Sequence, residues 1–481
     1  MDNTYTTHTL PNGLRMVHVH TGSPVAWCGL AVNAGSRDDG EGRYGLAHFV
    51  EHTIFKGTTH RRSWHIINRM ESIGGELNAY TTKEHTMVYS VFPAQHLARA
   101  VELIADLVRC STFPHDEIER ERDVVLEEAA SYRDTPSDAV YDDVEDILFA
   151  GSALGHNILG NEEHLRKMGS QQCMDYLKSL YVPDNMAFFV VGPMPAERAF
   201  RQAERHLGGM DCPLHREARV LPPVVAPSRH TVELHLHQAH TVAALRLPSL
   251  YSDERFALSL LNNILGGPGM NSLLNVQLRE RRGYVYTVES SISLMSDCGL
   301  MQVYMGCDPS DIRSSLRVID RVTRDLAERC LPECRLDAAK RQYCGQLLLA
   351  ADSAEWVAMN AGRNMLCHGD ITPLDQMMER ITSVTPEQVR HAARHITLDR
   401  STVLTLLWAS LQLNISRAAP VVAQPSMLIC ATTRVLLHHL VGLVAVDDDI
   451  DARERTVAHV AHRVDISHVL VAWVAVRLCI L

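Results

Sequence analysis

The sequence predicts an α+β protein made of two homologous α/β-sandwich domains. Segments of the first half align without gaps to segments of the second half: 48–57 to 258–267, 170–192 to 385–407, and 113–114 to 331–332. The offsets of 210, 215 and 218 residues are nearly equal, which indicates two copies of one unit. Both halves also mix strand-like alternation with long amphipathic helical patterns, as expected of helices packed on a sheet.

The expected elements alternate along each copy. In the first copy, apolar alternation predicts strands over residues 16–34, 86–92 and 187–191. Helical patterns in the same copy cover residues 94–109, 114–133 and 170–180. In the second copy, strand-like patterns cover residues 231–247, 285–306 and 401–407.

Composition marks the limits of the two copies. Residues 208–229 are rich in Gly and Pro, as expected of a linker. We therefore expect an N-terminal domain over 1–207 and a C-terminal domain over 230–409. Residues 410–481 match neither copy and contain no Lys, Phe or Tyr. We expect an atypical extension there, either frame-shifted or disordered, with a small independent domain as the alternative.

Overall composition indicates a globular protein of a reducing compartment. The 481 residues are 46% hydrophobic and 21% charged, and the net charge of −11 argues against nucleic acid as a main partner. The 12 cysteines include no C-x-x-C pair, which argues against a disulfide framework. No signal or transit peptide and no membrane-spanning apolar run is visible, so we expect no membrane contact and a bacterial cytoplasmic location.

The motif His48-Phe49-Val50-Glu51-His52 indicates metal chemistry. On a helix, two histidines four residues apart and the glutamate between them share one face. Two neutral imidazoles suit zinc, and a carboxylate beside a zinc-bound water suits a general base. Because the chain has 26 histidines, the motif alone is about as consistent with chance as with a site. Helical punctuation, with Gly45 before the motif and Gly57 after it, favours the site.

A catalytic zinc usually has a third protein ligand. The segment 114–133 is a strong helical pattern that begins at Pro114, with a predicted buried stripe of Ile118, Val124, Val125 and Leu126. Glu121 and Glu128 lie two helical turns apart beside this stripe, where an unpaired carboxylate would be costly. Without the first motif, a solvated acidic face would be the preferred interpretation.

Together, HFVEHTIFKGT at 48–58 and ERDVVLEEA at 121–129 resemble the pitrilysin/insulinase family of zinc metallopeptidases. The likeness is greatest to the branch of mitochondrial processing peptidase and its bacterial relatives. It implies one zinc ion per chain with His48, His52 and Glu128 as ligands. It also implies Glu51 as the catalytic base and Glu121 as a residue that supports the site. Glu127 lies next to Glu128, so a one-residue ambiguity remains.

Two more segments resemble the family. Gly74 to Thr82 matches the strand that pairs with bound peptide, which implies Asn78, Ala79 and Tyr80 in substrate binding. From the residues alone, an exposed edge strand and an ordinary core hairpin are equally favoured. Leu278 to Tyr286 matches the second-half motif that supplies Arg279 and Tyr286 to the substrate. There, a Tyr hydroxyl would stabilise the oxyanion and an Arg would orient the peptide.

The internal repeat shows which residues the fold needs and which it does not. In the second copy the four site positions become Leu258, Leu261, Asn262 and Gln346. Because a fold does not require metal ligands, their presence in the first copy alone indicates function.

The resemblance implies a zinc metalloendopeptidase whose two domains form half of a clamshell around an extended peptide. Because backbone pairing tolerates many sequences, we expect loose specificity. The chain would act as a homodimer or with a related partner chain. The alternative is a non-catalytic partner or structural subunit, which the intact motif disfavours. A metal-binding protein without a substrate is a third hypothesis, which only the histidine content supports.

Overall fold

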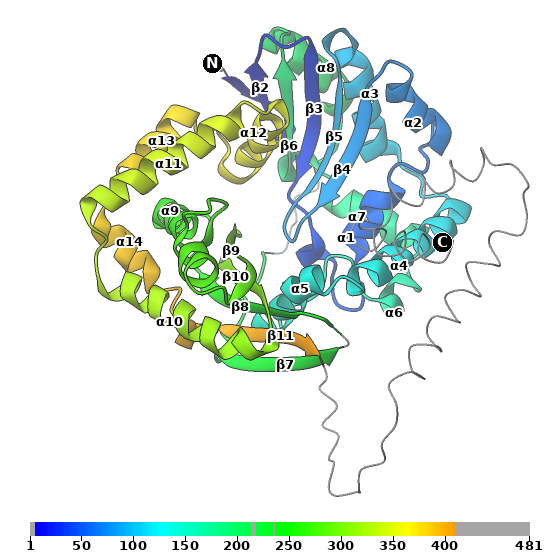
Figure 1. Ribbon diagram of the computed structural model, residues 1–481. Coiled ribbons are helices and arrows are strands. Elements are labelled where there is room, and N and C mark those ends of the chain that lie inside the picture. The colour runs from blue at the N-terminus through cyan, green and yellow to red at the C-terminus, as the bar shows by residue number, and fades with distance from the viewer. Residues whose placement is uncertain (1–4, 213–217, 235, 409–481) are drawn as a thin grey trace, which may run out of the picture. The chain divides into compact units, whose positions relative to one another are not determined.

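A computed structural model of the protein describes residues 5–212, 218–234 and 236–408. The expectations for residues 410–481 lie outside these described residues. Two mixed β-sheets carry helices on their faces, one sheet in each half of the chain (Figure 1). None of the helices in the described ranges is long and apolar enough to cross a membrane.

Apart from the additional edge strand β1 of the first sheet, the two sheets have the same strand order. The first runs β1-β2-β6-β3-β5-β4 and the second runs β7-β11-β8-β10-β9. The strands of the first sheet are β1 Tyr5–Thr9, β2 Arg15–His20, β3 Val25–Val32, β4 Glu76–Thr81, β5 Thr86–Pro93 and β6 Met186–Gly192. Those of the second are β7 Ser228–Leu234, β8 Ala239–Leu247, β9 Val285–Leu294, β10 Gly299–Cys307 and β11 Thr402–Trp408. Each sheet has one parallel pair at the equivalent place, β2 with β6 and β7 with β11. The predicted pair of homologous α/β domains is therefore confirmed.

The helices repeat only in part, because the first half has more of them than the second. The first half contains α1 Leu46–Thr53, α2 Ser63–Glu71, α3 Leu97–Cys110, α4 His115–Arg133, α5 Pro136–Leu148, α6 Glu162–Leu165, α7 Ser170–Leu180 and α8 Ala196–Leu207. The second half contains α9 Arg255–Gly266, α10 Ile312–Glu328, α11 Glu333–Ala351, α12 Ala354–His368, α13 Leu374–Thr382 and α14 Pro386–Ala393. The helices α4 and α11 each have 19 residues and each follow a proline, as the alignment of Pro114 with Pro332 predicts.

The helix α1 ends earlier than its sequence suggests. We expected Gly57 to stop it, but its last residue is Thr53. Gly57 instead forms an isolated β-bridge with Arg62, and a Cβ at this position would lie 2.9 Å from Pro114 Cγ. The glycine therefore permits a close approach of two segments and does not cap the helix.

The buried stripe of α4 is also narrower than predicted. Ile118 and Val125 are buried, and Leu126 packs partly against the core. Val124 is 49% exposed, so its place in the predicted stripe was wrong. Ile118 and Val125 are seven residues apart and share one face, whereas Val124 is rotated by about 100° from Val125.

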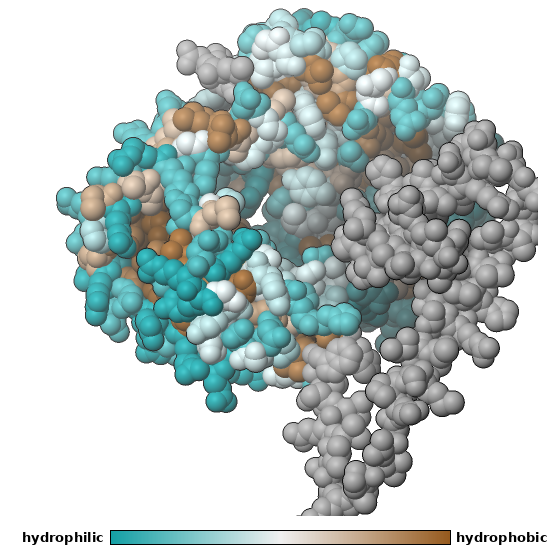
Figure 2. All heavy atoms as spheres, in the orientation of Figure 1, coloured by the Kyte–Doolittle hydropathy of each residue, from teal (hydrophilic) through white to brown (hydrophobic). Residues whose placement is uncertain are grey.

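The outer helices of the second half show simple amphipathic order. In α10, Leu316 and Ile319 are buried, whereas Arg317 and Arg321 are exposed. The surface over this helix is correspondingly hydrophilic in Figure 2. Its apolar residues complete the core between the second sheet and the helices that cover it.

Each half contributes one helix that packs on the sheet of the other half. The helix α5 packs on β8 and β11, where Val140 and Val144 join a core with Val242 and Leu404. In return, α12 packs on β2, β3 and β6 of the first sheet. A cut through the linker would therefore separate both sheets from a helix that covers them. The domain limits at 207 and 230 stay a prediction.

The approach of α12 to the first sheet is close. Ala358, Ala361 and Met365 pack in one core with Val17 and Phe189. A Cβ on Gly362 would lie 2.6 Å from Phe189 Cδ1, so only glycine allows this approach.

Candidate metal centre

The helix α1 brings His48 and His52 together on one face. Their ring centroids are 4.5 Å apart, with the ring planes inclined by 64°. The chain enters the helix at Gly45, whose φ of 97° lies in the left-handed region that favours glycine. A Cβ at Gly45 would also lie 2.8 Å from the carbonyl oxygen of Leu159. The glycine before the motif is thus required by both conformation and space.

A buried carboxylate holds the start of α1. Asp39 accepts hydrogen bonds from the backbone N–H groups of Gly45 and Ala47, each at 2.7 Å. His156 Nε2 lies 3.3 Å from the same carboxylate, and its ring stacks on Tyr44 with centroids 4.1 Å apart. Complete burial raises the pKa of Asp39. Sequence reasoning missed Asp39 and His156, because they lie too far along the chain from the motif to form a local capping pattern.

The helix α4 brings Glu128 to the two histidines. Glu128 Oε2 lies 3.4 Å from His52 Nε2 and 3.8 Å from His48 Nε2. One ligand atom from each of these residues lies within 4.8 Å of the others. Both glutamates are exposed, but only Glu128 brings a carboxylate oxygen to the two histidines. The geometry therefore favours Glu128 over its neighbour.

Glu121, one of the two acidic residues singled out on α4, orients His52. Its Oε1 accepts a hydrogen bond from His52 Nδ1 at 3.0 Å, and its Oε2 pairs with Lys56 Nζ at 2.6 Å. Because Nδ1 is the donor in this bond, Nε2 of His52 is left with its lone pair toward Glu128. Lys56, four residues after His52, was missed by sequence reasoning.

The donor set fits a zinc ion. Burial lowers the pKa of His48 to about 3, so its imidazole stays neutral, which is the form that binds metal. His48 Nε2 and His52 Nε2 both lie toward Glu128 Oε2, so two nitrogens and one carboxylate oxygen converge. Two histidines and one glutamate are an established ligand set for catalytic zinc.

Glu51 links the helix to the edge strand. Its carboxylate lies beside Thr81, the last residue of β4, whose hydroxyl and backbone favour the ionised form of Glu51. Burial raises the pKa of the Glu51 carboxyl. Its Oε2 is buried with no hydrogen-bond partner in the described part of the chain. Thr81 was not singled out from the sequence, because no local pattern connects it to Glu51.

The strand β4 lies at the edge of its sheet. It pairs only with β5, in the register Asn78↔Tyr89, Ala79↔Val88 and Tyr80↔Met87. Its other side carries no strand among the described residues, and α1 packs beside it. Of the two interpretations of this hairpin, the structure supports the exposed edge.

Arg279 and Tyr286 are not drawn into the metal centre. Arg279 lies in the π-helical turn Asn275–Glu280, and Tyr286 lies in β9, one of the two edge strands of the second sheet. Tyr286 is 63% exposed. Neither side chain forms a hydrogen bond or ion pair within the described ranges. Their contact with substrate therefore stays a prediction.

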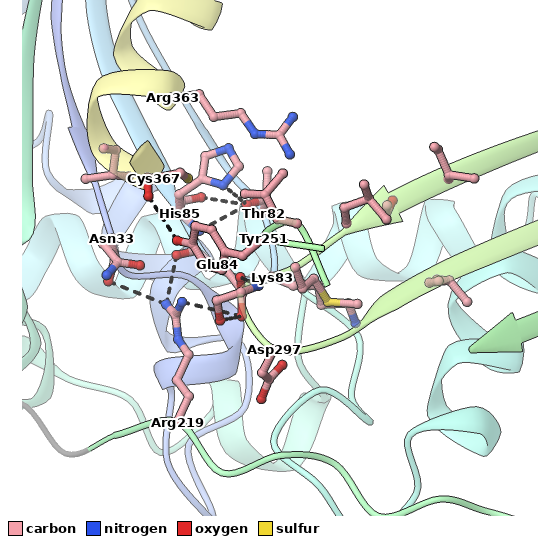
Figure 3. Close-up of a pocket in the computed structure, with 18 of the residues that line it drawn as sticks. Asn33, Thr82, Lys83, Glu84, His85, Arg219, Tyr251, Asp297, Arg363 and Cys367 are labelled. Atoms are coloured by element: carbon pink, nitrogen blue, oxygen red, sulfur yellow. Dashed lines mark hydrogen bonds and ion pairs between the residues drawn. The ribbon is translucent and has the colours of Figure 1, made fainter. Parts of the chain in front are cut away.

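A cavity of about 580 Å³ opens where β4 ends (Figure 3). It lies between the β4–β5 turn and the β9–β10 turn, so both halves line it. Glu84 of the first turn accepts hydrogen bonds from Arg37 at 2.6 Å and from the N–H and hydroxyl of Ser296 at 2.7 Å each. Arg37 also pairs with Asp297 of the second turn. This network joins the two hairpins beside the edge strand.

Comparison with known proteins shows which family the chain is similar to. Residues 15–162 match the model of Insulinase (Peptidase family M16), and residues 167–343 match that of the Peptidase M16 inactive domain. An uncharacterized zinc protease of Mycobacterium tuberculosis is 33% identical over 400 residues, which cover 81% of this chain and 90% of the relative. The chain belongs to the M16 peptidase family. The resemblance noted from the sequence is thus confirmed.

Other relatives extend the comparison. An uncharacterized zinc protease of Bacillus subtilis is 29% identical over 81% of this chain and 95% of its own length. The mitochondrial-processing peptidase subunit beta of Bos taurus is 29% identical over 82% of each chain. The crystal structure of a protease from Helicobacter pylori superposes with a TM-score of 0.77 at 19% identity, over 84% of this chain and 99% of that chain. This last likeness concerns the fold alone.

Proposed function

We propose that this M16 family member is a zinc-dependent metalloendopeptidase that hydrolyses peptides or unfolded segments bound in extended form. One observation supports this proposal most strongly: His48, His52 and Glu128 converge, with Glu51 beside them on the same helix. Relatives that are named zinc proteases support the same chemistry. The proposed stoichiometry at this centre is one zinc ion per chain.

The residues divide the work of hydrolysis. When bound, zinc supplies a Lewis acid that polarises the peptide carbonyl and lowers the pKa of a coordinated water. Glu51 accepts a proton from the attacking water and then donates it to the leaving amine nitrogen. The raised pKa of its buried carboxyl suits both steps, because a group whose pKa lies nearer to neutrality accepts a proton more readily and can still release it. Glu121 fixes the ring of His52 throughout.

The edge strand provides the peptide site of this proposal. An extended peptide would pair with the free side of β4 at Asn78, Ala79 and Tyr80, next to Thr81 and Glu51. Backbone pairing of this kind binds many sequences. Tyr286 would stabilise the oxyanion and Arg279 would orient the peptide, from this chain or from a second chain, since both are exposed.

The alternative function is that of a non-catalytic partner subunit. The match of residues 167–343 to an inactive domain and the relationship to a processing-peptidase subunit favour partnership with a second chain. The complete ligand set in the first half argues for an active subunit. A homodimer or a heterodimer with a related chain fits both hypotheses. The bacterial source of two zinc protease relatives supports a bacterial protein, and a cytoplasmic location stays a prediction.

The deciding experiment is cleavage of a mixed peptide library by the zinc-loaded chain, with products identified by mass. We expect cleavage that a chelator abolishes and added zinc restores. The Glu51→Gln variant is the matched control, because it keeps the ligands and removes the base. A zinc-loaded wild-type chain that cleaves nothing, alone or mixed with a related chain, would support the structural-subunit alternative.

A further inference from the structure

A second cluster of metal-binding side chains lies in the half of the molecule that lacks the catalytic ligands. His391 lies in the last turn of α14, and His395 lies four residues later in the turn that follows this helix. Glu254 lies at the start of α9 and brings a carboxylate to both rings. Its Oε2 lies 3.2 Å from His391 Nδ1 and 3.2 Å from His395 Nε2. The three ligand atoms lie within 4.8 Å of one another.

These distances match a tetrahedral zinc ion. Zinc–nitrogen and zinc–oxygen bonds of about 2.0–2.2 Å at the tetrahedral angle hold ligand nitrogen and oxygen atoms about 3.3–3.5 Å apart. The two separations at Glu254 are close to this range. At the catalytic centre the corresponding separations are 3.4 and 3.8 Å. The two oxygen–nitrogen separations of the second cluster are therefore as close to the zinc range as those of the first.

The charged neighbours of the second cluster leave its carboxylate free for a cation, whereas those of the cluster around Asp106 do not. A cavity of about 350 Å³ lies beside the second cluster and is lined by its Glu254 and His391 but not by His395. The other charged residues that line it are Asp253, Glu387, Arg390 and Arg394. Neither arginine forms an ion pair with Glu254 among the described residues. At the cluster of His60, Asp106 and Cys110, in contrast, Arg61 lies 2.5 Å from the Asp106 carboxylate and occupies the place of a cation.

We propose that His391, His395 and Glu254 bind a second zinc ion, with water completing its coordination. The ion would tie α14 to the first turn of α9. These two helices already pack together through Val389 and Ala392 of α14 and Ala257 of α9. Since α14 leads into β11, a central strand of the second sheet, the bound ion would stabilise this half. The site is structural, because all three protein ligands lie away from β4 and α1.

This second site shares no residue with the catalytic centre, so its test does not depend on the proposed peptidase activity. The full chain is loaded with zinc chloride, freed of excess metal by gel filtration, and analysed for zinc per chain. The double variant His391→Ala/His395→Ala should contain about one zinc ion less than the wild type. Its rate of peptide hydrolysis should stay unchanged. The test compares the zinc content of the variant with that of the wild type and does not rely on either value alone. Both proteins contain further histidines beyond residue 408, such as His438 and His439.

Arg390→Ala is the matched control, since Arg390 lies on the same helix and lines the same cavity. This variant should keep the full zinc content. Added zinc should raise the unfolding temperature of the wild type and of Arg390→Ala but not that of the double variant, in chains whose catalytic zinc is already bound. Equal zinc content in the wild type and the double variant would overturn the proposal. So would an equal response of their unfolding temperatures to zinc.

Discussion

The pair α1 and α4 in the first half and the pair α9 and α11 in the second half are the same scaffold with different contents. In each pair, the two helices pack against each other beside an edge strand. In the second half, Leu258 and Leu261 are each 1% exposed and belong to the apolar core. In the first half, the equivalent positions hold His48 and Glu51.

The difference shows what the metal centre costs. Burying a leucine contributes about 1.5–3 kcal/mol to folding, whereas a buried polar group without a partner costs about 1–3 kcal/mol. His48 Nδ1 and Glu51 Oε2 are both buried without hydrogen-bond partners in the described segments. The second half therefore gains stability at positions where the first half carries a proposed metal ligand and the proposed base.

The largest effect should come from separating the two halves. A fragment that ends at residue 207 keeps all the proposed zinc ligands but loses α12, which covers Val17 and Phe189. We expect this fragment to show no cooperative unfolding transition by circular dichroism. Supplying residues 208–481 as a separate chain should restore the transition. A fragment that folds alone and binds zinc would show that the shared cores are dispensable.

The next largest effect concerns Glu51. Glu51→Gln should lower the turnover rate by about 10⁴-fold, the upper end for loss of a general base. Zinc content should stay at the wild-type value, because the ligands remain. Steady-state kinetics and metal analysis of the same preparation check both points. Turnover near the wild-type rate would exclude Glu51 as the base.

A smaller loss should follow from the exposed edge of the second sheet. Tyr286→Phe removes only a hydroxyl and should lower the turnover rate by about 10² to 10³, with little change in KM. Arg279→Ala should instead raise KM, because an orienting residue acts before reaction.

Mixing variants shows which chain Tyr286 serves. If it acts on a second copy, inactive Glu51→Gln chains mixed with Tyr286→Phe chains should regain part of the wild-type rate. If it acts within its own chain, the mixture should stay as slow as the Tyr286→Phe enzyme. A Tyr286→Phe variant with wild-type kinetics would remove the residue from the mechanism altogether.

Variants of Glu128 and Glu127 test which of the two is the third zinc ligand, the position that is Gln346 in the second half. Glu128→Gln places in the first half the residue type that the second half has at Gln346. We expect its zinc affinity at the catalytic centre to fall at least about 10- to 100-fold, as measured by competition with a chelator. Glu127→Gln, with an exposed side chain, should bind zinc as the wild type does. Equal losses in both variants would contradict the geometry.

The smallest effect concerns stability and pH. Burial holds the pKa of His48 near 3, whereas an unfolded chain has the ordinary value of 6.5. Between these values the unfolded state binds a proton that the folded state does not, so stability falls as pH falls. His48→Leu copies the second half and should remove this contribution, about 1.4 kcal/mol per pH unit. Denaturant titrations of metal-free proteins between pH 6 and 4 test it, and parallel pH profiles would contradict it.

The sequence predicted the elements of the fold well where a local pattern was complete. The limits of α7 were predicted correctly, as was the start of α4 after Pro114. It failed at Gly57, because a glycine that permits contact with Pro114 looks the same in sequence as a glycine that ends a helix. It failed at Val124 because adjacent apolar residues on a helix do not face the same way.

Some residues of the candidate site could be recognised from the sequence, and others could be recognised only from the structure. His48, Glu51 and His52 follow from a spacing of three and four residues on one helix, so the sequence alone indicated them. The partners Asp39, Lys56 and Thr81 form no such pattern. They could be recognised only after the chain folded, because each acts through contact with a residue of the motif or with its helix.

By itself, the sequence determined that the protein has two related domains, that one of them holds a motif typical of zinc sites, and that the other lacks it. Periodicity, residue spacing and internal alignment indicate these properties, and all three can be recognised within short or repeated segments of the sequence. Only the tertiary structure decided that Glu128 and not Glu127 faces the histidines, that β4 is an edge, and that α5 and α12 are exchanged between the sheets. It also brought Glu254 to His391 and His395. Each of these depends on contacts between residues distant in sequence, and the packing of the whole core determines such contacts.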